Sequence, residues 1–130
     1  MSRDLAGLEA IAAMMFDAEL ARLNAVSAEL AARTAELAAL AEARNARAEM
    51  LQSGGGGDDF AFLAGQDGLW SAWLVRTGAR LSREAAEIAA RREAQRLRAQ
   101  KAFGKRDALR QMRAREDADR HRKQDRTRGD

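Results

Sequence analysis

The side chains of this sequence with the clearest chemical potential are cations that recur at helical spacing. Arg106, Arg110 and Arg113 follow one another at spacings of four and three, with Arg115 close by. Such spacings place side chains along one stripe of an α-helix. Guanidinium groups bind carboxylates well, so the expected counterpart of this stripe is an acidic protein surface.

Aromatic residues near the middle of the chain form a second candidate recognition site. Both tryptophans and two of the four phenylalanines fall within fourteen residues, namely Phe60, Phe62, Trp70 and Trp73. Exposed aromatic side chains are frequent hot spots of protein interfaces. The alternative is that these rings only cover the last core layer beside a turn, formed by Met50 and Leu51.

Residues typical of catalytic or metal sites are isolated. The single histidine, His121, has no second histidine near it, and the chain contains no cysteine. The glycines at 54–57 lack the Lys-Ser/Thr of a phosphate-binding loop. The sequence therefore predicts no catalytic residue, metal, cofactor or small-molecule substrate, and a protein that is not an enzyme.

Composition indicates long helices in place of a globular core. The chain has 130 residues, 46% of them hydrophobic, and no proline; alanine supplies most of the apolar fraction. No run of about 20 apolar residues is present, so no membrane span is expected. The absence of cysteine fits a reducing cytoplasm.

Charge is divided unevenly along the sequence. Residues 1–65 contain 5 Arg and 10 acidic residues, a net charge of −5, whereas residues 66–130 contain 18 Lys or Arg and 10 acidic residues, a net charge of +8. The two halves attract each other if they pair along their length.

Heptad repeats on both sides of the glycine run predict a long two-helix antiparallel coiled-coil hairpin, an all-α fold. The apolar residues that step by seven are Phe16, Leu23, Leu30 and Leu37, and then Leu74, Leu81 and Ile88. We expect a first helix at 1–52, a turn at 53–67 holding a short apolar segment that Gly65 ends, a basic second helix at 68–122 begun by Asp67, and a disordered tail at 123–130.

The antiparallel pairing predicts contacts far from the glycine turn. Phe103 is expected to be buried against Phe16, with Met15 and Met112 nearby, while Gly104 allows the two backbones to approach. The arginine stripe is expected on a separate face of the second helix.

The heptad segment 16–51 and the charged segment "AQKAFGKRDALRQMRAREDADRHRKQD" at 99–125 give the chain a family resemblance. A hairpin of this length with a basic C-terminal arm resembles the FliJ/YscO-type stalk proteins of flagellar and type III protein export. The resemblance implies a cytoplasmic coiled-coil stalk that contacts the hexameric export ATPase, the export gate and export chaperones. It implies membrane contact only indirectly, at the inner-membrane export apparatus.

Two other functions remain open on the residues alone. The first is a structural adaptor coiled coil for an unrelated protein partner. The second, less favoured, is a small basic protein associated with nucleic acid, because basic arms can bind phosphates. The acidic residues interspersed among the cations weaken that last interpretation.

Overall fold

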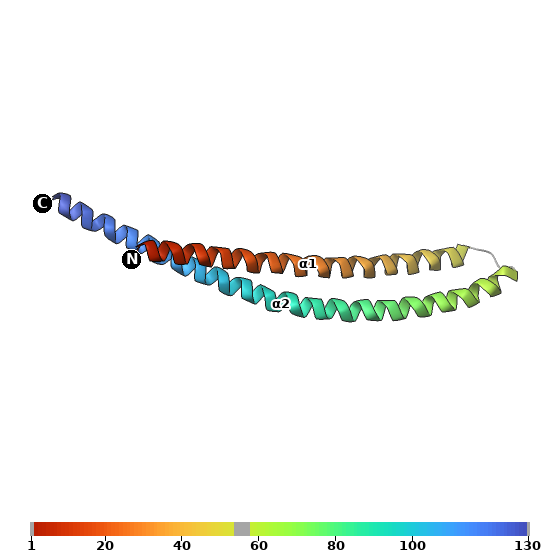
Figure 1. The fold of residues 1–130 in the computed structure, drawn as a ribbon. Helices are drawn as coiled ribbons and strands as arrows, with labels where there is room; N and C mark the ends of the chain where they lie inside the picture. Colours follow the sequence, from red (N-terminus) through yellow and green to blue (C-terminus); the bar gives the residue numbers. More distant parts are fainter. Residues whose placement is uncertain (1, 54–57, 130) are drawn as a thin grey trace. The chain divides into compact units, whose positions relative to one another are not determined.

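The structure, a computed structural model, describes residues 2–53 and 58–129, with side chains described over 3–53 and 65–129. These residues form two long helices, α1 (Ser2–Ser53) and α2 (Asp58–Gly129), of 52 and 72 residues. The two helices pack against each other as an antiparallel hairpin (Figure 1). The predicted all-α hairpin is confirmed.

The hairpin divides into two compact units, each built from one segment of each helix. Unit 1 combines Met1–Ala25 with Arg92–Asp130, and unit 2 is Val26–Arg91. In each unit the α1 and α2 segments lie side by side and bury one stripe of small and aliphatic side chains.

The buried stripe follows the predicted heptads. On α2 the residues that step by seven are all buried from Leu74 to Gln95 and half-buried at Ala102 and Leu109. On α1 the matching stripe is half-buried, at Phe16, Leu23, Leu30 and Leu37. Leu81 is the most enclosed of the core residues, with 2% of its surface exposed. A seven-residue apolar repeat keeps one face of each helix on its neighbour, which is why this pattern forms a two-stranded coiled coil.

Polar side chains at or beside the core positions connect the two helices of unit 2. Three ion pairs cross between them: Glu29–Arg91 at 2.6 Å, Arg33–Glu84 at 2.9 Å and Arg47–Asp67 at 2.9 Å. Ion pairs that remain partly open to solvent, as these do, contribute only about 0–1 kcal/mol each. Sliding one helix along the other would separate these charges, so the pairs chiefly specify the register.

Unit 1 is fixed in register by two polar contacts. Arg113 pairs with Glu9 at 2.9 Å. Gln95, which is buried, donates a hydrogen bond of 3.0 Å to the Glu19 carbonyl oxygen and a second bond to the Glu19 carboxylate. A shift of one helix along the other would break both hydrogen bonds and leave the buried Gln95 amide without a partner, which is unfavourable.

The start of α2 differs from the prediction. The helix begins at Asp58, ten residues before the expected start at 68, and continues through Gly65 and Gly68. Gly65 therefore does not end a helical segment, and Asp67 is not a cap but the acceptor of the Arg47 ion pair. The Arg47–Asp67 ion pair ties this stretch to α1 and helps to offset the cost of about 1 kcal/mol for each helical glycine. The glycines at 54–57, predicted to form the turn, lie outside the described residues.

The C-terminal segment also differs from the prediction. α2 runs to Gly129, so residues 123–129, expected to be a disordered tail, are helical. Two pairs three residues apart lie just before this stretch, Arg120–Asp117 at 2.8 Å and Arg122–Asp119 at 2.5 Å, and within it the Thr127 hydroxyl donates a hydrogen bond of 2.8 Å to the Lys123 carbonyl oxygen. Such local pairs, together with Arg126 and Arg128 at the negative end of the helix dipole, stabilise a helix that has no packed face.

Candidate partner-binding surfaces

The predicted arginine stripe of unit 1 separates into two kinds of side chain. Arg106 is half-buried, and its guanidinium carbon lies 5.5 Å from the centre of the Phe16 ring. A cation over an aromatic face is stabilised by the ring electrons. Arg106 therefore packs on the apolar seam between the helices, and the prediction that the cations and the apolar residues occupy separate faces is wrong at this position.

Arg113 is also committed to the hairpin. It donates a hydrogen bond of 2.9 Å to the Glu9 carboxylate. This bond, followed by the charge of Glu9, raises the pKa of Arg113 above its ordinary value. A partner that used Arg113 would have to break this contact between the two helices.

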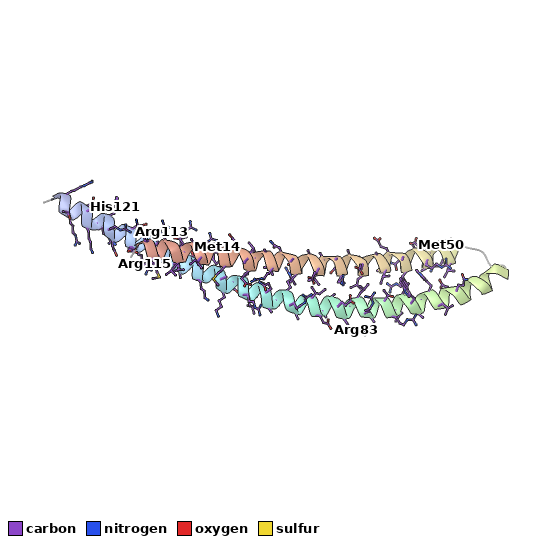
Figure 2. All side chains as sticks on the ribbon, viewed as in Figure 1. Met14, Met50, Arg83, Arg113, Arg115 and His121 are labelled. Atoms are coloured by element: carbon purple, nitrogen blue, oxygen red, sulfur yellow. The ribbon has the colours of Figure 1, made fainter. Side chains whose placement is uncertain are left out.

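Arg110 and Arg115 remain available to a partner. Both are exposed, and neither forms an ion pair with any side chain in the described part of the chain. Figure 2 places Arg115 on the C-terminal part of α2. Of the four arginines that the sequence singles out, these two are free to meet an acidic surface.

Phe103 makes its predicted contact but is only partly buried. Its ring meets that of Phe16 edge to face, with ring centres 5.5 Å apart and an interplanar angle of 62°, so the predicted contact is confirmed. Phe103 is nevertheless 50% exposed, and the expectation that it is buried is wrong. A Cβ added at Gly104 would meet no atom within 4 Å, so this glycine does not serve a close approach of the backbones.

The tryptophans at the other predicted site are placed differently from each other. Trp70 is half-buried and, with Met50 and Arg47, lines a hollow of about 440 Å³ between the helices of unit 2. Trp73, one turn further along α2, is 46% exposed. The side chains of Phe60 and Phe62 lie outside the described residues. The structure thus divides the tryptophans between a half-buried position and an accessible one.

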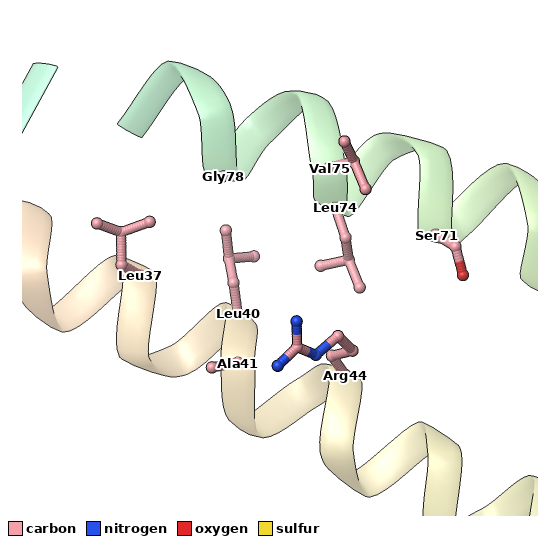
Figure 3. A pocket seen from close by; sticks show the side chains of 8 residues that line it. All are labelled: Leu37, Leu40, Ala41, Arg44, Ser71, Leu74, Val75 and Gly78. Carbon is pink, nitrogen blue, oxygen red and sulfur yellow. The ribbon is translucent and has the colours of Figure 1, made fainter. Parts of the chain in front are cut away.

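Unit 2 contains a groove that the sequence did not indicate. It measures about 310 Å³, and Figure 3 shows the eight residues that line it: Leu37, Leu40, Ala41, Arg44, Ser71, Leu74, Val75 and Gly78. Arg44 stands at a core position of α1, and its guanidinium lies between the helices beside Leu40 and Leu74 (Figure 3). Gly78 has no side chain with which to fill the space. The signal for this groove was the interruption of the heptad at Arg44 opposite small residues of α2.

Unit 1 contains a smaller hollow of about 190 Å³ with a different lining. Its walls are Ala12, Met15 and Glu19 from α1, and Arg98, Lys101, Ala102 and Lys105 from α2. The lining of this hollow therefore combines three cations with alanine and methionine side chains. Sequence reasoning missed this site because it assigned Met15 to the contact with Phe103.

Groups typical of catalysis do not converge on these surfaces. Within residues 2–53 and 58–129, no three His, Cys, Asp or Glu side chains are grouped so that they could hold a metal ion. His121 is exposed on the last part of α2 (Figure 2). Neither helix, over the stretches described, has a segment long and apolar enough to cross a membrane.

Comparison with known proteins gives no relative: no family model, no curated protein and no solved structure matches the chain.

Proposed function

We propose that this protein is a non-enzymatic coiled-coil stalk of a flagellar or type III protein export apparatus, acting in the cytoplasm at the inner-membrane face of that apparatus. In this role unit 1 contacts the hexameric export ATPase, and other parts of the hairpin contact the export gate or export chaperones. The observation that carries the proposal is the presence of two exposed, unpaired arginines, Arg110 and Arg115, on a hairpin whose register is fixed.

The fixed register supports a mechanical role. Ion pairs such as Arg33–Glu84 and Arg113–Glu9 resist sliding of one helix along the other, so each unit holds its side chains at defined heights. Charged contacts at the surface are individually weak and screened by water. Contacts of that strength suit a shaft that must change position inside a ring without becoming trapped.

The experiment compares two matched double charge reversals in binding to a purified hexameric export ATPase. Arg110→Glu with Arg115→Glu alters the proposed contact. Arg76→Glu with Arg83→Glu changes the net charge equally on unit 2, where both side chains are exposed; Figure 2 places Arg83 on the side of α2 away from α1. We expect the first pair to weaken binding at least about tenfold and the second by less than about twofold.

Circular dichroism of both variants at equal concentration is the control for folding. Equal binding of both reversed proteins and the wild type would contradict the proposed contact. Binding of the wild type should also weaken as salt rises from about 0.05 to 0.5 M, because the Debye length then falls well below 10 Å.

An adaptor coiled coil is the second candidate, and one observation favours it. Trp73 is 46% exposed, three residues after Trp70 on α2, which suits an aromatic anchor for another protein. This second function would be supported if the wild-type protein does not bind the export ATPase but binds another protein, and if Trp73→Ala abolishes that binding. Nucleic acid binding is less supported, since Arg120 and Arg122 are paired with Asp117 and Asp119.

A further inference from the structure

The α1 segment of unit 1 exposes an apolar stripe that α2 does not cover. Leu8, Ile11 and Met15 recur at spacings of three and four, which places them on one side of the helix. Ile11 and Met15 are 56% and 57% exposed, and Met14, one position around the helix, is 70% exposed. Large apolar side chains gathered on one helix face are characteristic of a surface that another molecule covers.

A row of cations on α2 borders the same stripe. Arg98, Lys101 and Lys105 recur at three and four, and they line the 190 Å³ hollow together with Met15 and Ala12. All three are exposed, and none forms an ion pair within the part of the chain that the structure describes. The stripe and the row therefore form one face, apolar on α1 and positively charged on α2.

The single carboxylate at the hollow does not neutralise this row. Glu19 already accepts hydrogen bonds from Gln95 of α2 and, at 2.7 Å, from Arg22 of its own helix. Its charge is thus satisfied by groups other than the three cations. The face offers positive charge to whatever molecule covers it.

We infer that this face of unit 1, formed by Leu8, Ile11 and Met15 with Arg98, Lys101 and Lys105, binds an amphipathic α-helix that carries carboxylates beside its apolar stripe. The hollow lies between two antiparallel helices, which is where a third helix packs to complete a bundle. Apolar residues of the incoming helix meet the stripe on α1, and its carboxylates meet the row on α2. This site is distinct from Arg110 and Arg115 of the proposed function.

Charge argues against a second copy of the chain as the occupant. A two-fold dimer formed on this face places the same patch on both partners, so the row containing Lys101 and Lys105 would face a patch of the same positive charge. Like charges brought together at an interface are unfavourable. Shape argues against a lipid surface, since a hollow between helices is concave and a bilayer surface is flat.

The test uses two synthetic helical peptides of about 21 residues, three heptads long, with leucine at the a and d positions. One peptide carries glutamate at the flanking e and g positions, and the other carries lysine there. Binding of each fluorescently labelled peptide to the full chain is followed by anisotropy at about 0.15 M salt. We expect the glutamate peptide to bind at least about tenfold more tightly than the lysine peptide.

Variants of the full chain locate the site. Met15→Glu, and separately Lys101→Glu with Lys105→Glu, should each weaken binding of the glutamate peptide by about tenfold or more. Leu69→Glu places the same charge at another exposed apolar residue, on unit 2, and should alter binding by less than about twofold. Because these side chains are exposed, the helical content measured by circular dichroism should be unchanged.

Several outcomes would overturn the inference. Equal affinity for both peptides would show that charge does not select the partner. An equal loss of affinity with Leu69→Glu and with Met15→Glu would show that the peptide does not bind at this face. Sedimentation showing a dimer that Met15→Glu dissociates would make a second copy the occupant. Binding to vesicles of anionic lipid that Met15→Glu abolishes, without effect on the peptide, would make it a membrane surface.

Discussion

Leu81 offers the sharpest test of the packing between the two helices, because it is only 2% exposed and stands at the centre of the α2 heptad. Replacing it with alanine removes three carbons from the core. At about 0.8 kcal/mol for each buried methylene, the transfer cost is about 2.4 kcal/mol. The cavity left behind adds to this cost, while partial collapse of a narrow hairpin reduces it, so we expect a loss of about 2–3 kcal/mol.

A matched substitution on the same helix isolates this effect. Leu69 is 76% exposed, and Leu69→Ala should change the free energy of unfolding by less than about 0.5 kcal/mol. Both variants would be unfolded in urea and followed by circular dichroism at several protein concentrations, so that dissociation of any assembly is separated from unfolding. A Leu81→Ala variant as stable as Leu69→Ala would refute the assignment of the heptad face.

Three further measurements test other parts of the structure. Gly104→Ala should stabilise the protein by about 0.5–1 kcal/mol in urea unfolding, because the added Cβ meets no atom within 4 Å and alanine favours helix; a loss of stability would instead indicate a close approach at this glycine. Hydrogen bonding from Arg80, the largest influence, holds the pKa of Glu84 below its ordinary value, so the stabilisation from Glu84 is present above about pH 4.5 and is lost as the pH falls through the lowered pKa. The melting temperature of Glu84→Gln should therefore fall less than that of the wild type on acidification. If both melting temperatures fall equally, the Arg80–Glu84 pair does not stabilise the protein. In single-tryptophan variants, the more exposed Trp73 should emit at longer wavelength and be quenched by acrylamide more strongly than Trp70, and the opposite order would reverse their assignment.

Fold class was predictable from the sequence because two simple signals agree. Seven-residue steps from Phe16 and from Leu74 specify one buried stripe on each helix. The glycines at 54–57 lie between the two stripes and divide the sequence into two helical segments. Antiparallel pairing around that interruption brings Phe16 close to Phe103, as observed.

The candidate sites were less predictable because a strict heptad does not fix which neighbouring side chains turn inward. In unit 2 of α2, side chains both three and four residues after a heptad position are half-buried, at Thr77 and Gly78 and again at Glu84 and Ala85. In unit 1 only the position four residues after turns inward, at Ala99 and Arg106. The 3.6-residue turn drifts relative to a seven-residue repeat, which accounts for this shift. Arg106 consequently turns toward Phe16 instead of joining the exposed stripe.

The start of α2 was mispredicted because local propensity was given too much weight. Gly65 and Gly68 disfavour helix, and the sequence alone does not show that Arg47 pairs with Asp67 or that Trp70 packs beside Met50. Contacts with the other helix override a cost of about 1 kcal/mol for each glycine. The hollow at Met15 was missed for a related reason, since the sequence shows an apolar residue but not the side of the helix pair on which it lies.

The most direct test of the proposed stalk function is the stimulation of a purified export ATPase, measured as the steady-state rate of phosphate release with increasing amounts of this protein. Wild-type protein and the variant with Arg76→Glu and Arg83→Glu should raise the rate equally. The variant with Arg110→Glu and Arg115→Glu should retain its helical content and require at least about tenfold more protein for the same stimulation. If that variant stimulates the ATPase as well as the wild type does, or if the wild type causes no stimulation, the stalk proposal is contradicted.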